Sequence, residues 1–161
     1  MELSVKILRK LVFLSAGIAG AGLMTMVLVT FVDVVLRKFG HPFAGAYDLV
    51  KMAAGVTMAC ALPYTTAIKG HVAVEFFYHR MGSRRRVIAD TCIRIVIMAL
   101  FILLTWQLLQ HGARLHSSGE VSMTLQVPTF WVPYVMAYAC ALVVLVTLYH
   151  LLHPGQALIK L

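Results

Sequence analysis

The side chains in this sequence that are able to carry chemistry are its seven histidines and three cysteines. Two imidazoles facing each other across a helical bundle can ligate a haem, and paired cysteines in exposed loops can exchange disulfides. The cysteines are Cys60, Cys92 and Cys140, and no two of them form a CxxC or paired-loop pattern. We therefore expect them to pack as small apolar residues.

The histidines lie near the ends of the apolar stretches and not at their centres. His41, His111 and His116 fall on one side of the expected membrane, and His71, His79, His150 and His153 fall on the other. A histidine at headgroup depth is typical of an amphipathic surface residue. A haem-binding anchor would need a pair of imidazoles at the helix centres, and the sequence places none there. We keep a haem- or quinone-associated anchor of a redox complex as the alternative function.

Charged residues are also missing from the centres of the apolar stretches, where a transport site would place them. Asp33, Asp48 and Lys51 stand near one boundary, and Asp90 and Arg94 stand near the other. This pattern predicts no catalytic residue, no metal ligand and no cofactor. We expect a protein that is not an enzyme and not a transporter by itself.

Long apolar stretches dominate the chain, which is 61% hydrophobic and 12% charged. Twenty-two residues between Lys10 and Asp33 carry no ionisable side chain, enough to cross the ~30 Å hydrocarbon core of a bilayer as a helix. The sequence predicts an all-α integral membrane protein with one domain over residues 1–161. Four transmembrane helices are expected, at residues 11–32, 49–68, 87–110 and 129–150.

Local signals refine these spans. Pro63 predicts a kink in the second helix or an early end near Thr65, because proline lacks the backbone donor. Asp90 and Arg94 lie one turn apart in the third helix, where they can pair. Pro128 suits the start of the fourth helix, and Trp131 and Tyr134 fit an interfacial aromatic belt. Small residues, among them Gly17, Gly20, Gly55 and Ala59, indicate close helix packing.

Basic residues predict the orientation, because cytoplasmic loops carry the excess of lysine and arginine. Both termini share one side, and that side holds ten of the fourteen basic residues. We therefore expect cytoplasmic termini and no nucleic-acid partner, despite the net charge of +8. The basic residues beside the membrane are interpreted as topology and lipid anchors: Lys10, Arg84, Arg85 and Arg86.

The segment between the second and third helices has helical periodicity. Val72, Phe76, Phe77 and Met81 recur at about one turn, and polar residues fall largely between them. The spacing predicts a short interfacial amphipathic helix over residues 71–81.

Four stretches together resemble the DctQ-like family, the small permease subunits of tripartite ATP-independent periplasmic (TRAP) transporters. They are residues 33–39, residues 42–51 with Asp48, the Lys-Gly-His-Val-Ala-Val-Glu stretch at 69–75, and residues 125–128 followed by Trp131 and Tyr134. The third stretch is the most specific. Similarity in length, span number and loop positions extends over nearly the whole chain.

The resemblance implies a scaffold in the bacterial cytoplasmic (inner) membrane. Its partners would be a large TRAP permease subunit, which holds the substrate and sodium sites, a periplasmic substrate-binding protein, and membrane lipids. The solute would be a carboxylate taken up by ion-coupled symport. The residues to which we assign an interface or structural role are Arg37, Asp48, Lys51, Gly70, His71, Glu75, Asp90, Arg94, Pro128 and Trp131.

Overall fold

The computed structural model describes residues 2–68 and 83–152, and over these residues the chain is helical. The four helices are α1 (Glu2–Lys38), α2 (Ala46–Ala67), α4 (Ser83–Ser118) and α5 (Trp131–Leu152). The described residues form no strand, only an isolated bridge between Val121 and Pro128. The predicted all-α class is confirmed. The predicted interfacial helix at 71–81, with Gly70, His71 and Glu75, lies outside the described residues.

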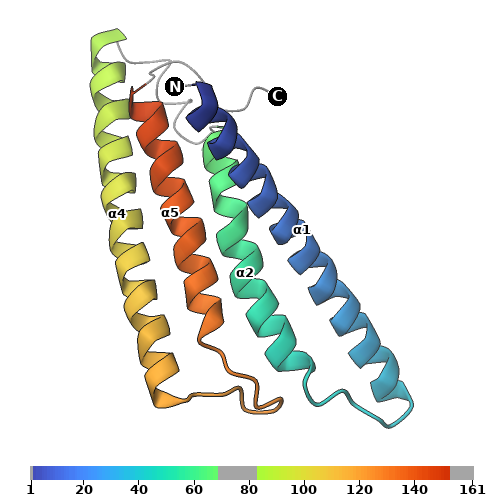
Figure 1. Ribbon diagram of the computed structural model, residues 1–161. Helices are drawn as coiled ribbons and strands as arrows, with labels where there is room; N and C mark the ends of the chain where they lie inside the picture. The colour runs from blue at the N-terminus through green and yellow to red at the C-terminus, as the bar shows by residue number, and fades with distance from the viewer. Residues whose placement is uncertain (1, 69–82, 153–161) are drawn as a thin grey trace.

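The helices form one layer in the order α4, α5, α2 and α1, so α2 and α5 are central and α1 and α4 flank them (Figure 1). The beginnings of α1 and α4 lie with the end of α5 at one end of the layer, which we call the terminal end. The connections 39–45 and 119–130 lie at the opposite end. We call these connections and the adjoining helix turns the loop end.

Three of the described helices are long and apolar enough to cross a membrane: Val5–Lys38, Thr91–Ser118 and Trp131–Leu152. The fourth described helix, α2, is not one of them. It has the length of a span, but Lys51 near its beginning and the run from Pro63 to Thr66 lower its mean hydropathy. The predicted second span, residues 49–68, therefore stays a prediction.

The helices extend beyond the predicted spans. α1 has 37 residues and α4 has 36, which corresponds to about 55 Å each at 1.5 Å per residue. Both exceed the hydrocarbon core of a bilayer, because a helix continues through charged residues until its backbone is interrupted. Gly40 and Gly119 provide the interruption, with φ of 79° and 65°, a conformation that glycine adopts without a steric penalty.

The centre of the layer is packed through small side chains. Ala19, Ala59, Cys60 and Ala139 form one buried cluster between α1, α2 and α5. A Cβ built on Gly55 of α2 would lie 3.6 Å from side chains of α5. In lipid, helices gain little from the hydrophobic effect when they associate, so they are held together mainly by close packing. Small residues allow this packing because they let the helix backbones approach each other.

Of the cysteines, Cys60 and Cys140 are buried as expected, whereas Cys92 is exposed on α4. The helix continues past the buried Pro63 and ends at Ala67, two residues beyond Thr65, and the kink predicted as the other outcome stays a prediction. The hydroxyls of Thr65 and Thr66 donate hydrogen bonds to carbonyls of the preceding turn, which supports the backbone next to the proline.

Candidate interface at the loop end

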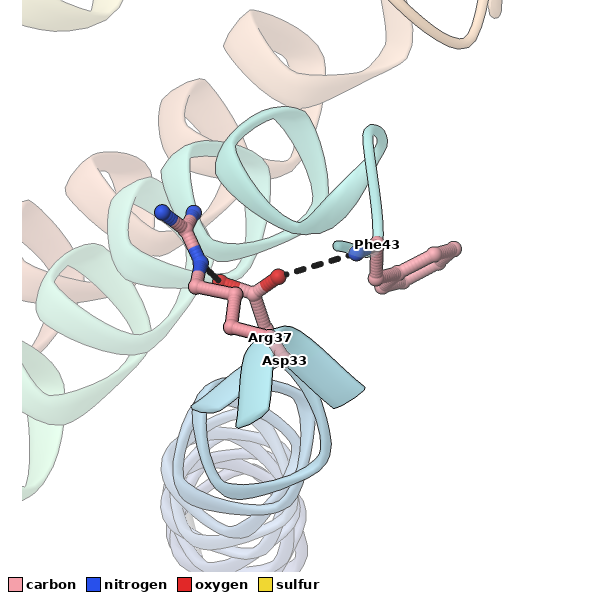
Figure 2. Close-up of polar contacts among 3 residues, drawn as sticks. All are labelled: Asp33, Arg37 and Phe43. Atoms are coloured by element: carbon pink, nitrogen blue, oxygen red, sulfur yellow. Dashed lines mark hydrogen bonds and ion pairs between the residues drawn. The ribbon is translucent and has the colours of Figure 1, made fainter. Parts of the chain in front are cut away.

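Asp33 fastens the first connection to the end of α1 (Figure 2). Its Oδ2 accepts a hydrogen bond from Arg37 Nε at 2.9 Å, one helical turn later. Its Oδ1 accepts a hydrogen bond from the backbone N–H of Phe43 at 3.0 Å. Asp33 is 8% exposed, so the backbone of the connection is held by a carboxylate that is almost removed from solvent.

The chain can return to Asp33 because α1 ends in a tight turn. The N–H of Gly40 donates to the carbonyl of Arg37 at 3.1 Å, and the N–H of His41 donates to the carbonyl of Leu36 at 3.1 Å. These bonds satisfy carbonyls left open at the helix C-terminus. Residues 39–45 are therefore closed against the helix that precedes them.

Asp48 fastens the second connection to the first turn of α2. Its Oδ2 accepts hydrogen bonds from the backbone N–H groups of Thr124 at 2.8 Å and Leu125 at 3.1 Å. These amides lie 76 and 77 residues further along the chain. Asp48 is 5% exposed, so this carboxylate ties α2 to the α4–α5 connection at a buried position.

The hydrogen bonds also set the charge state of Asp48, which precedes the predicted second span. The hydrogen bond from the Thr124 amide is the largest influence and lowers the pKa of the carboxyl below its ordinary range. Desolvation opposes this, while hydrogen bonds from the Leu125 amide and from Ser122 and Thr124 add to the lowering. Asp48 is therefore ionised near neutral pH.

The α4–α5 connection is folded on itself before it reaches Asp48. The N–H of Ser122 donates to the carbonyl of Val127 at 2.9 Å, and the N–H of Gln126 donates to the carbonyl of Ser122 at 3.2 Å. Gln126 has φ of 52°, which is costly for a residue with a Cβ. The backbone of the tip is thus held in one conformation.

Glycines allow the loops and helices of this end to meet. A Cβ on Gly45 would lie 2.4 Å from the Leu125 side chain, so the absence of a side chain brings the two connections together. A Cβ on Gly112 would lie 3.1 Å from the ring of Tyr134. His116 and Phe130 stack edge to face nearby, with ring centroids 4.8 Å apart.

The other predicted residues of this end differ in placement. Lys51 is exposed, and the side chain of Arg37 is 65% exposed beyond its contact with Asp33. Trp131 is the first residue of α5 and is 40% exposed. Pro128 does not start α5, because it pairs with Val121 and the helix begins at Trp131. The predicted partner contacts of these residues stay predictions.

At the terminal end, Arg94 of α4 donates a hydrogen bond from its guanidinium to the carbonyl of His150 near the end of α5. A cation at a helix C-terminus is favourable, because the last carbonyls carry partial negative charge. Only the backbone is described for residues 83–90, so the predicted Asp90–Arg94 pair and the anchors Arg84, Arg85 and Arg86 are not tested. Lys10, the other predicted anchor, is exposed.

Sequence reasoning missed the two loop attachments. It placed Asp33 and Asp48 at the same end of the helices, as the structure does, but assigned them no partner inside the chain. The spacing of Asp33 and Arg37 is a usable signal, since residues four apart are neighbours on a helix. The amides of Phe43, Thr124 and Leu125 give no signal, because every residue except proline has one.

The arrangement can hold backbone in place but brings no reactive set of side chains together. Over the residues that the structure describes, no group of three histidine, cysteine, aspartate or glutamate residues could hold a metal ion.

Comparison with known proteins gives one match. The family model described as "Tripartite ATP-independent periplasmic transporters, DctQ component" matches residues 26–155. This range holds the last third of α1 and all of α2, α4 and α5. Searches of curated proteins and of solved structures gave no match.

Proposed function

Because this chain belongs to the DctQ family, the small permease component of tripartite ATP-independent periplasmic transporters, we propose that it scaffolds the large permease subunit in the membrane. The family is a transporter component and not an enzyme family. Family membership over most of the chain is the observation that carries the proposal.

The flanking helices support a scaffold. No residue in the most apolar stretch of α4 is buried, and only 17% of the corresponding stretch of α1 is. These exposed apolar faces can be covered by lipid or by the apolar helices of a partner subunit. A one-layer arrangement leaves broad faces on both sides for this contact (Figure 1).

The proposal includes a topology. α2 is the remaining membrane span, both termini are cytoplasmic, and the loop end faces the periplasm. The excess of basic residues on the side of the termini supports this orientation. The protein is then a multi-pass component of the bacterial inner membrane.

The transported solute would contact the large subunit, where the substrate and sodium sites lie, and a periplasmic substrate-binding protein would deliver it. We propose a carboxylate as the solute and sodium as the coupling ion. The charged side chains Asp33 and Asp48 are engaged inside this chain, which supports placing the transport sites elsewhere. If the substrate domain of the large subunit moves, this chain belongs to the part that stays fixed.

Reconstitution tests the proposal. Vesicles would be made with the large subunit alone, with this chain alone and with both, each with the substrate-binding protein and a sodium gradient. Uptake of labelled carboxylates is expected only when both membrane components are present. Uptake by either component alone would contradict the scaffold role, and a Soret band in the purified complex would favour the redox-anchor alternative.

A further inference from the structure

The outer side of α4 carries four polar side chains in the half of the helix that leads to the loop end. Gln107, Gln110, His111 and Arg114 are all exposed, and their spacing puts them on one face of the helix. We call these four residues the polar edge. Over the part of the chain that the structure describes, no hydrogen bond or ion pair joins their side chains to another residue.

The polar edge faces away from the rest of the chain. α4 lies at one side of the layer and packs against α5 (Figure 1). At this height the contacts with α5 are made by Gly112 and His116, which meet the rings of Tyr134 and Phe130. Arg114 is two residues from each of Gly112 and His116, so it is turned about 200° from both at about 100° per residue. The polar edge therefore points towards whatever surrounds this chain in the membrane.

The two glutamines of the polar edge lie inside the proposed membrane region. α5 begins at Trp131, the residue expected in the interfacial aromatic belt, and His116 is level with this start through its contact with Phe130. Gln107 lies about 13 Å from His116 along the helix axis, at 1.5 Å per residue. A glutamine side chain is too short to bring its amide to the headgroups over this distance.

An amide at this depth needs a hydrogen-bonding partner. It has two N–H donors and a carbonyl acceptor, and hydrocarbon chains offer partners for neither. A threonine can satisfy its hydroxyl within its own helix, as Thr105 does by donating to the carbonyl of Phe101 at 2.7 Å. The helices α1, α2 and α5 contain no glutamine or asparagine. The two exposed amides of α4 therefore indicate a polar partner at this face.

The polar edge continues towards the terminal end as an apolar surface. Leu100 and Leu103, on the same face of α4, are 54% and 63% exposed. Leu100, Leu103, Gln107, Gln110 and Arg114 follow one another at alternating steps of three and four residues. This is the spacing of the seam between two packed helices, in which a polar residue specifies the partner and its register. We call these five residues the α4 seam.

Charge distinguishes between the helices that could cover the α4 seam. Copies of this chain insert in the same orientation, so pairing α4 with α4 would place two Arg114 side chains beside each other at one depth. Such a juxtaposition of like charges is unfavourable. A helix of a different protein can offer carbonyl or carboxylate acceptors to the arginine and to the amides.

We infer that a membrane-spanning helix of the large permease subunit packs along the α4 seam and accepts hydrogen bonds from Gln107, Gln110 and Arg114. The inference rests on the proposed function, which supplies the partner, and it adds the surface and the chemistry of the contact. Leu100 and Leu103 pack against the apolar part of the partner helix. The amides fix the register of that helix along α4.

Replacement of both amides tests the α4 seam. The two subunits are labelled with donor and acceptor dyes and reconstituted in vesicles of zwitterionic lipid, and energy transfer is measured as lipid dilutes them. Gln107→Leu with Gln110→Leu is expected to raise the dissociation constant about tenfold, because interhelical hydrogen bonds are lost. Thr30→Val removes an exposed polar side chain from α1 and is the control, which should leave the dissociation constant unchanged.

Thermal unfolding of this chain by itself separates a lost contact from a damaged fold. The double variant should unfold at a temperature no lower than the unmodified chain does, because leucine suits an exposed position in lipid better than glutamine. A dissociation constant that is unchanged in the double variant would overturn the inference.

Photo-cross-linking identifies what covers the α4 seam. A photo-reactive amino acid in place of the exposed Leu103 should form adducts with the large permease subunit. Adducts with lipid alone, or with a second copy of this chain, would also overturn the inference.

Failure of the proposed function has a different signature. The unmodified subunits would then show no energy transfer above the level expected for independent proteins in the same vesicles. Association of the unmodified subunits that persists equally in the double variant contradicts only the assignment of the α4 seam.

Discussion

Asp33 and Asp48 are two buried carboxylates at the same end of the molecule, yet they organise different parts of the fold. Asp33 binds an amide ten residues away and closes a turn beside its own helix. Asp48 binds two amides 76 and 77 residues away and ties α2 to the connection between α4 and α5. The first attachment is local, whereas the second joins the two halves of the chain.

The difference indicates how a protein in an apolar solvent can fix its architecture. Lipid weakens the hydrophobic drive that holds helices together, so specific polar contacts at the helix ends gain importance. A local contact can be lost with only a turn disturbed. A contact between distant segments fixes which helices are neighbours. We therefore expect its removal to destabilise the whole loop end.

Removing the Asp48 charge should have the largest effect. In Asp48→Asn the amides of Thr124 and Leu125 lose their ionised acceptor, so both should exchange hydrogen at least about tenfold faster and the thermal midpoint should fall. Lys51→Gln, one turn later on α2, is the control. Unchanged exchange at Thr124 would show that Asp48 does not hold the connection.

Acidification should reproduce part of this effect in the unmodified chain. The pKa of Asp48 is lowered in the folded protein, so the stability from this group is present above the unfolded pKa of about 3.9 and is lost as pH falls through the folded value. Exchange at Thr124, corrected for its intrinsic pH dependence, should therefore accelerate below that range. In Asp48→Asn this additional acceleration should be absent.

The Asp33 attachment should show a smaller and confined response. Asp33→Asn weakens one charge-assisted hydrogen bond to the Phe43 amide, at a cost of about 1 to 2 kcal/mol in the free energy of unfolding. Hydrogen exchange should rise over residues 39–45 only. Arg37→Gln should cost less, about 0.2 to 1 kcal/mol, because the arginine side chain is largely solvated. Faster hydrogen exchange at Leu125 in Asp33→Asn would contradict the claim that the Asp33 attachment acts only locally.

The backbone of the α4–α5 tip offers the smallest effect, and one of opposite sign. Gln126 has φ of 52°, so Gln126→Gly should relieve strain and raise the free energy of unfolding by about 1 kcal/mol. Gly119→Ala, at φ of 65°, is the matched control and should lower it. Destabilisation by Gln126→Gly would mean that the side chain contributes more than the strained backbone costs.

The sequence predicted the helices because their signal is a long run of one kind of residue. The stretch after Lys10 and the stretch after Thr129 are helical as expected. The ends were less predictable: α4 continues past residue 110 to Ser118 and stops before Gly119. A helix ends where the backbone can turn, as at Gly119, and the hydropathy of the sequence does not predict that position.

The sequence predicted which end of the helices holds these polar residues, but it did not predict their contacts inside the chain. Asp48 was placed near one boundary by the limits of the apolar stretches, but its two partners are backbone amides on a distant connection. Such partners follow only from tertiary packing, in which Gly45 lets Leu125 approach. Arg94 gives the same lesson: it was expected to pair with Asp90 within α4, which stays a prediction, and the contact that the structure describes is with the backbone of α5.

The central claim, that this chain scaffolds a larger permease, is tested most directly by purifying the tagged chain from native membranes in mild detergent and quantifying what accompanies it by mass spectrometry. The account predicts a large polytopic permease in near-equal amount. Recovery of the chain alone, or with redox subunits in place of a permease, would contradict it.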